Sequence, residues 1–99
     1  MRFEWDGEKD RINQRKHEGL AFGTAAQVFN DPNVVFRMDR VVAGEQRWHA
    51  IGCAVGAVLL VVHVYRRELE DASEEIIRII SAREADKRER RIYIQQAVD

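Results

Sequence analysis

The stretch Glu74-Glu75-Ile76-Ile77-Arg78-Ile79-Ile80-Ser81-Ala82-Arg83 runs directly into Glu84-Ala85-Asp86-Lys87-Arg88-Glu89-Arg90-Arg91-Ile92-Tyr93. The first segment is typical of a buried strand, and the second is typical of a short charged helix. Arginine has little structural use inside so apolar a strand. A guanidinium group, however, binds phosphate oxygens in a planar, bidentate way and stays charged at any working pH. The junction of the two segments is therefore the first candidate for a phosphate-binding site.

The composition indicates one small globular domain covering residues 1–99. Apolar residues make up 45% and charged residues 33% of the chain, too apolar for disorder and too charged for a membrane protein. A formal net charge of −1 hides two local groups of like charge. The acidic group is Glu68, Glu70, Asp71, Glu74 and Glu75, and the basic group is Lys87, Arg88, Arg90 and Arg91. Such local charge, more than net charge, steers a charged ligand.

Several features predict a cytoplasmic protein with no membrane partner. The single cysteine, Cys53, has no partner for an internal disulfide. The first residues are charged and lack the apolar segment of a secretion signal. The longest apolar run, 50–62, is shorter than the roughly 20 residues of a membrane-spanning helix. We interpret it as two strands with a turn near Gly56.

Periodicity predicts an α+β fold with two N-terminal helices, a mainly antiparallel four- to five-stranded sheet and a C-terminal helix. A short strand is expected at 3–5, helices at 7–17 and 22–29, and a last helix at 84–96. Asp6 is the expected N-cap of the first helix, and Thr24 is an alternative start of the second. Strands are expected at 34–39, 47–53, 57–66 and 75–82, with a hairpin turn at 43–45 and a polar loop at 69–73.

Short motifs lie in order along the chain: Phe3-Glu4-Trp5-Asp6, Asn13-Gln14-Arg15-Lys16-His17, Ala26-Gln27-Val28-Phe29-Asn30-Asp31-Pro32, Gly44-Glu45-Gln46-Arg47-Trp48-His49-Ala50-Ile51-Gly52, Val64-Tyr65-Arg66, and Arg78-Ile79-Ile80-Ser81-Ala82-Arg83 through Glu89-Arg90 to Tyr93. Each motif alone is weak, but the set at these spacings resembles the BrnT family of bacterial type II toxins over nearly the whole chain.

The resemblance implies a RelE-like fold and an endoribonuclease that cuts RNA without a metal, stops translation and arrests growth. It also implies a ribbon-helix-helix antitoxin (BrnA-like) that neutralises the toxin. The complex of the two proteins would repress its own operon, so operator DNA would be contacted only through the antitoxin.

The chain departs from the family pattern around its second helix. Glu18 follows His17 where the family commonly has glycine, and Ala21-Phe22-Gly23-Thr24 replaces a Ser-Phe-Glu-Glu capping box. Losing a capping side chain costs about 1 kcal/mol. These differences from the family pattern change the expected start of the second helix, but they do not change the expected fold. We interpret 67–73 as a variable surface loop.

Metal-free RNA cleavage needs a base for the 2′-hydroxyl, cations for the phosphate and an acid for the leaving 5′-oxygen. The catalytic candidates are Arg83, Arg66, Arg78, Tyr93, His49 and Arg47. We favour phosphate contact for Arg83, and for Arg66 because the resemblance places an arginine there. For Arg78, phosphate contact and an ion pair with Glu4 or Glu75 remain equal alternatives.

The remaining candidates each have a simpler structural interpretation. Tyr93 could pack the last helix onto the sheet, although RelE-type toxins use a C-terminal tyrosine in catalysis. His49 shares a strand face with Arg47 and could pair with it in acid–base work, whereas His63 is typical of a core histidine. Lys16 and His17 suit a helix C-terminus and are second-rank site candidates.

The basic run of the last helix is either a solvated face or an RNA-backbone contact through Lys87, Arg88 and Arg90. The three histidines lack the spacing of metal ligands, so we expect no metal or other cofactor. Val34, Phe36 and Met38 are expected in the core rather than in an antitoxin groove, and Trp48 fits either place. Two alternative functions stay open: a catalytically inactive co-repressor and an RNA-binding module.

Overall fold

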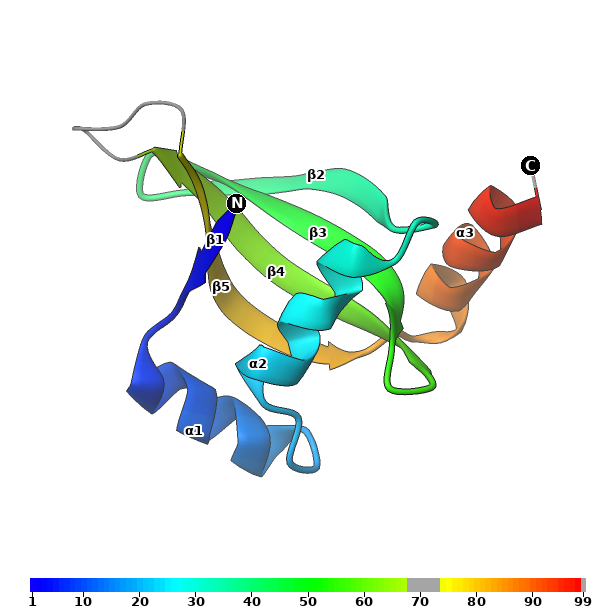
Figure 1. Ribbon diagram of the computed structural model, residues 1–99, viewed down its shortest axis with the longest axis horizontal. Helices are drawn as coiled ribbons and strands as arrows, with labels where there is room; N and C mark the ends of the chain where they lie inside the picture. Colours follow the sequence, from blue (N-terminus) through cyan, green and yellow to red (C-terminus); the bar gives the residue numbers. More distant parts are fainter. Residues whose placement is uncertain (68–73, 99) are drawn as a thin grey trace.

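The computed structural model describes residues 1–67 and 74–98, without the side chains of residues 67, 97 and 98. The elements follow in the order β1 (Arg2–Glu4), α1 (Gly7–Lys16), α2 (Phe22–Ala25), the 3₁₀ helix η1 (Ala26–Asn30), β2 (Val35–Val42), β3 (Glu45–Ala54), β4 (Ala57–Arg67), β5 (Glu75–Glu84) and α3 (Lys87–Val98). Figure 1 shows α2 running across the sheet, with α3 set apart from α1 and α2. The predicted α+β class and C-terminal helix are confirmed.

The five strands form one mixed sheet in the order β1-β5-β4-β3-β2. The three pairings among β2, β3, β4 and β5 are antiparallel, because tight hairpins or a short connection join these strands. β1 pairs with β5 in parallel, so the sheet is not purely antiparallel. Pattern in the sequence cannot give this pairing, because the two strands lie at opposite ends of the chain.

The second predicted N-terminal helix is wrong in its extent. α2 covers only Phe22–Ala25, and the chain then tightens into η1. Thr24 does not cap it, because the helix already begins at Phe22 and no side chain of the N-cap residue binds its backbone. Asp10 on α1 replaces the missing cap, with its Oδ1 accepting the Phe22 N–H at 2.9 Å.

The face of the sheet beneath α2 and η1, here called the covered face, holds the main core. Phe22, Ala25 and Val28 pack there on strand residues that share this face. These strand residues are Ala50, Ala54, Leu59, Val61, Ile79 and Ala82. Gly52 lies directly under Val28, so close that a Cβ atom would stand 2.7 Å from Val28 Cγ1. Glycine at this position lets the helical layer approach the sheet.

His63 is fully buried on the covered face, which confirms its prediction as a core residue. Its ring makes edge contacts with Phe29, Phe36 and Tyr65. Burial lowers its pKa to about 4, so the ring is neutral at pH 7. The prediction that Phe36 and Met38 are core residues is wrong, since they are 45% and 67% exposed. They lie on the edge strand β2, beyond the main core cluster.

Both predicted hairpin turns are confirmed and have two residues with positive φ. These are Ala43 (51°) and Gly44 (78°) in one turn, and Val55 (47°) and Gly56 (77°) in the other. Such angles match the tight turns that best fit the twist of paired strands. Val55 is the unusual residue, because a β-branched side chain rarely adopts this conformation.

Three further expectations concern the start of the last helix, membrane-spanning helices and the acidic loop. The last helix begins at Lys87 rather than at 84, because β5 continues to Glu84. Within the described residues, no helix is long and apolar enough to cross a membrane. The predicted loop at 69–73 and the acidic residues Glu68, Glu70 and Asp71 lie outside the described residues.

Candidate functional site

The strand candidates share the face of the sheet opposite α2, here called the open face. Its candidates are Arg47, His49, Arg66, Arg78 and Arg83. The strand register places them there, because His49 pairs with Val62, Arg78 with Val64 and Arg83 with Leu60. Alternation along β4 points these three partners away from the covered face.

A β-bulge in β5 is what puts Arg78 and Arg83 on the same face. Their spacing of five residues would place them on opposite faces of a regular strand. In the sheet, Ser81 pairs with Val62 while Ile79 pairs with the next residue, His63. Ile80 is therefore an extra residue without a partner on β4, and it restores the alignment of the two arginines. The sequence contains no clear signal for this bulge.

Arg83 is held by a two-pronged ion pair with Glu89 on α3. Its Nη1 and Nη2 donate to Glu89 Oε1 and Oε2 at 2.8 and 2.9 Å. Glu89 also forms a capping box with Asp86, in which each side chain accepts the other's backbone N–H at 2.8 to 2.9 Å. The hydrogen bonds from Arg83 lower the pKa of Glu89, so the carboxylate stays ionised at neutral pH. The first turn of α3 thereby fixes the direction of the guanidinium group.

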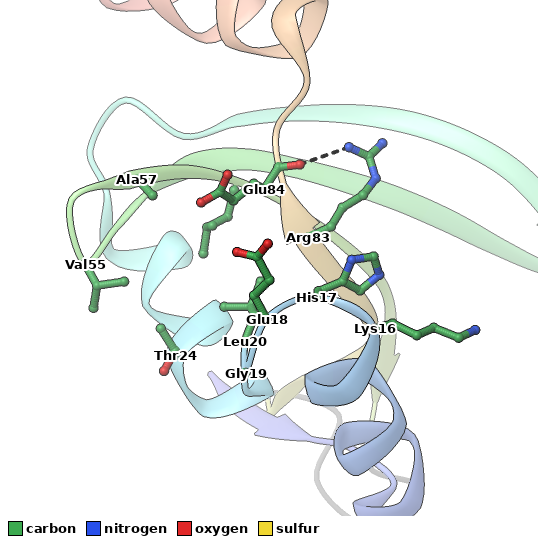
Figure 2. A pocket seen from close by; sticks show the side chains of 11 residues that line it. Lys16, His17, Glu18, Gly19, Leu20, Thr24, Val55, Ala57, Arg83 and Glu84 are labelled. Carbon is green, nitrogen blue, oxygen red and sulfur yellow. Dashed lines mark hydrogen bonds between the residues drawn. The ribbon is translucent and has the colours of Figure 1, made fainter.

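A hollow of about 520 Å³ brings Arg83 together with the second-rank candidates Lys16 and His17. Figure 2 shows these three side chains gathered on one side of the hollow, with Arg83 hydrogen-bonded to the backbone oxygen of Glu84. Lys16 ends α1, and His17 is its C-cap. Lys16 and His17 thus line the same hollow as Arg83, although the favourable interaction of a cation with a helix C-terminus could by itself explain both residues.

Asn13 positions this end of α1, and we had not singled it out from the sequence. Its side chain binds the backbone of Ala82 on β5 twice, donating to the oxygen at 2.9 Å and accepting from the N–H at 3.1 Å. It also donates to Leu20 O at 3.0 Å. The Asn13 side chain thus makes the two backbone hydrogen bonds to Ala82 that a neighbouring strand would otherwise make, one residue before Arg83. The only signal in the sequence is that Asn13 opens the motif ending in His17.

A second hollow of about 270 Å³ lies on the other side of the Arg83–Glu89 pair. His49, Glu89, Arg37 and Arg88 are among its lining residues. His49 Nε2 lies 3.1 Å from Asp39 Oδ2, so its partner is Asp39 rather than the predicted Arg47. Of the three proposed RNA-backbone residues, Arg88 lines this hollow. Arg90 instead donates to Ala85 O at 2.7 Å, and Lys87 is exposed.

Arg66 and Arg78 form a separate cluster around Glu4. Arg66 Nε donates to Glu4 Oε1, and Arg78 Nη1 lies 3.7 Å from the same oxygen. The hydrogen bond from Arg66 lowers the pKa of Glu4. One of the two alternatives for Arg78, the ion pair with Glu4, is therefore present. Neither arginine is among the residues that line the two hollows.

Tyr93 points toward the turn that follows η1. Its hydroxyl donates to Asp31 Oδ2 at 2.6 Å, and the same oxygen accepts the Cys53 N–H at 2.7 Å. This bond to a carboxylate raises the pKa of Tyr93 to about 12. Tyr93 lines neither hollow, and its contacts support the packing interpretation. In the part of the chain that the structure describes, no group of three or more His, Cys, Asp or Glu side chains is arranged to hold a metal ion.

Comparison with known proteins gives one family. No curated protein matches the chain. Residues 5–89 match the family model described as "Ribonuclease toxin, BrnT, of type II toxin-antitoxin system". The matched range includes α1, the bulged strand β5 and Glu89, which together build the site around Arg83. The chain therefore belongs to the BrnT family of ribonuclease toxins from type II toxin–antitoxin systems.

Proposed function

We propose that this protein is an endoribonuclease that cleaves RNA without a metal ion at the open face, with Arg83 at the centre of the site. The observation that carries the proposal is the placement of the Arg83–Glu89 pair between two hollows, with Arg83 lining one and Glu89 lining the other. The first hollow contributes Lys16 and His17, and the second contributes His49. Basic side chains and two histidines thus lie on the two sides of this pair.

These groups match the chemical steps of metal-free cleavage. The 2′-oxygen attacks the phosphorus atom as its proton passes to a base, and the bond to the 5′-oxygen breaks as that oxygen receives a proton. Arg83 and Lys16 would stabilise the charge that grows on the phosphate oxygens. His17 and His49 are the candidates for base and acid, because histidine exchanges protons near neutral pH.

The Arg83–Glu89 pair also favours a second candidate function. Both terminal nitrogens of Arg83 are bound to a carboxylate. An RNA phosphate would have to displace Glu89 or share the guanidinium group with it. A copy in which this pair does not open would bind the antitoxin and act only as a co-repressor.

Membership of the BrnT family also implies a protein antitoxin as the partner of this chain. A type II toxin acts together with a protein antitoxin, and we propose the ribbon-helix-helix type expected from the resemblance. The complex would bind operator DNA through the antitoxin and repress its own operon. The free toxin, of RelE-like fold, would act in the cytoplasm, where RNA cleavage stops translation.

The test is cleavage of a labelled RNA by purified, antitoxin-free protein in EDTA. We expect the parent protein to cleave and Arg83→Ala to lose roughly 100- to 1,000-fold in rate. Arg11→Ala is the matched control, because Arg11 is an exposed arginine on α1 that pairs with Glu8, three residues earlier on the same helix. Loss of cleavage in EDTA would contradict metal independence. A folded parent protein without activity would support the co-repressor function, and cleavage gained by a Glu89→Gln variant would show that the closed Arg83–Glu89 pair is what blocks the site.

A further inference from the structure

We propose that the cluster of Arg47, Arg66 and Arg78 is a separate subsite for the RNA backbone, several nucleotides away from the bond that is cut. The proposal deepens the proposed function and rests on it for the identity of the ligand. It assigns these arginines to binding a distant phosphate rather than to the chemical step.

The first support is placement on one continuous face. Arg78 and Arg83 both project from β5 onto the open face because of the bulge at Ile80. At about 3.3 Å per strand residue, their Cα atoms lie roughly 15 Å apart. This distance corresponds to about four nucleotides of a stacked strand at 3.4 Å each, and fewer if the strand is extended. An RNA bound at Arg83 can therefore reach the cluster without leaving the sheet.

The second support is the charge of the cluster. Arg78 Nη1 lies 3.7 Å from Glu4 Oε1, and this oxygen already accepts a hydrogen bond from Arg66 Nε. A contact of this length is longer than a hydrogen bond, so the Arg78 guanidinium group keeps its charge and donors for a ligand. The Arg66 and Arg78 side chains are 47% and 34% exposed, so both are accessible from solvent. The hydrogen bond from Arg66 already joins Glu4 of the short strand β1 to β4, so the charge of Arg78 is not needed for that contact.

The third support comes from Arg47 on β3. Its Nε atom is buried and has no hydrogen-bond partner among the described residues. A buried donor without an acceptor is uncommon in a native protein and needs an explanation, and a bound anion that supplies the acceptor is one. Arg47 lies one residue beyond the Trp48–His63 pair, next to Val64, and Val64 pairs with Arg78. The Cα atoms of Arg47 and Arg78 are thus about 10 Å apart across β4, at two strand spacings.

The test is binding of fluorescent single-stranded RNA of two lengths, about ten and about two nucleotides, to Arg83→Ala protein, in which cleavage is suppressed. Adding Arg78→Ala should weaken binding of the long RNA about tenfold. It should also lower the salt dependence of that binding by about 0.7 in the log–log slope, as for one lost phosphate contact. The short RNA should lose much less affinity. Arg78→Lys should recover part of the salt slope, because it keeps the charge.

Arg11→Ala in the same background removes an equal charge outside the cluster and should leave the preference for long RNA intact. Equal losses for both RNA lengths, or a loss that thermal unfolding of Arg78→Ala explains, would overturn the subsite. A matched assay on cleavage-competent protein separates the two proposals. There, Arg78→Ala should lower the ratio of kcat/KM for long over short RNA, whereas Arg83→Ala should lower both values alike. If the parent protein does not cleave but the length-dependent binding persists, the proposed function fails and the subsite stands.

Discussion

His63 and His49 lie on neighbouring strands, yet the covered and open faces of the sheet give them opposite properties. His63 is fully buried among aromatic rings and its pKa falls to about 4. The side chain of His49 is 30% exposed, and its Nε2 pairs with Asp39 beside a hollow. Strand alternation alone separates the two residues. In this sheet the face, rather than the residue type, decides which titratable groups can meet a ligand.

Asn13 joins α1 to the backbone of β5 one residue before Arg83, and Asn13→Ala is expected to have the largest effect. The variant leaves the buried N–H and C=O of Ala82 without their side-chain partners. At 1–3 kcal/mol for each unsatisfied group, unfolding free energy should fall by about 4 kcal/mol. RNA cleavage should also fall at temperatures where the variant is folded, because Lys16 and His17 lose their anchor. Urea unfolding measures the loss of stability, and RNA cleavage rates measure the loss of activity. Full activity in the folded variant would contradict the role of Asn13 in positioning Lys16 and His17.

His63 should make the covered face sensitive to acid. Its folded pKa of about 4 lies below the ordinary value of 6.5, so the unfolded chain binds the proton more readily between these values. Its stabilising contribution is complete above pH 6.5 and is lost as the pH falls toward 4, a change of roughly 3 kcal/mol.

His63→Phe keeps a ring among its aromatic neighbours but cannot titrate. Unfolding free energies at a series of pH values should show a smaller decrease from pH 7 to 4 in this variant than in the parent protein. Parallel curves for the two proteins would show that His63 is not a source of the acid sensitivity.

Gly52→Ala tests how tightly the covered face is packed. The new Cβ would meet Val28 Cγ1 at 2.7 Å and the Val28 backbone oxygen at 3.3 Å. Overpacking of this kind should cost about 2 to 3 kcal/mol. Gly23→Ala is the control, because the nearest atom to its Cβ is Trp5 Cη2 at 4.0 Å. Thermal denaturation should give a lower Tm for Gly52→Ala alone, and equal values for the two variants would contradict the close packing.

Tyr93→Phe tests whether the tyrosine of α3 has a catalytic or a structural role. Losing its hydrogen bond to the Asp31 carboxylate should cost about 2 kcal/mol. Cleavage by the folded variant should stay within about twofold of the parent rate, since the hydroxyl is bound to Asp31 and neither residue lines a hollow. A large loss of kcat with unchanged stability would reinstate Tyr93 as a catalytic residue.

Val55→Asn should give the smallest effect, and it is the one that stabilises the protein. Val55 has φ of 47° in a two-residue turn followed by Gly56. Asparagine adopts this conformation more readily, and Asn-Gly is the preferred pair in such turns. The expected gain is about 1 kcal/mol in chemical denaturation. Ala43→Asn in the other turn should gain less, because alanine is not β-branched, and the reverse order would contradict this account.

The sequence predicted the elements best where a repeating pattern was long or a turn was explicit. The β4 and β5 strands, the two hairpin turns and the C-terminal helix follow from apolar runs, glycines and a charged amphipathic segment. The prediction of the second helix was wrong in its extent, and its capping side chain, Asp10, lies twelve residues before Phe22 in the sequence. Phe36 and Met38 alternate like core residues but occupy an edge strand beyond the core cluster. Local pattern contains no information on which strand ends the sheet.

By itself, the sequence determined the α+β class, the family and the residue types suited to phosphate chemistry, because composition, periodicity and ordered motifs are local properties. Only the tertiary structure decided how those residues group. The parallel pairing of β1 brings Glu4 to Arg66 and Arg78, and the bulge at Ile80 aligns Arg78 with Arg83. Asn13 places His17 beside Arg83, and α3 supplies Glu89. The contacts of Glu4 and Asn13 join residues more than 60 positions apart in the chain, so no local pattern predicts them. The common face of Arg78 and Arg83 depends on the register between β4 and β5.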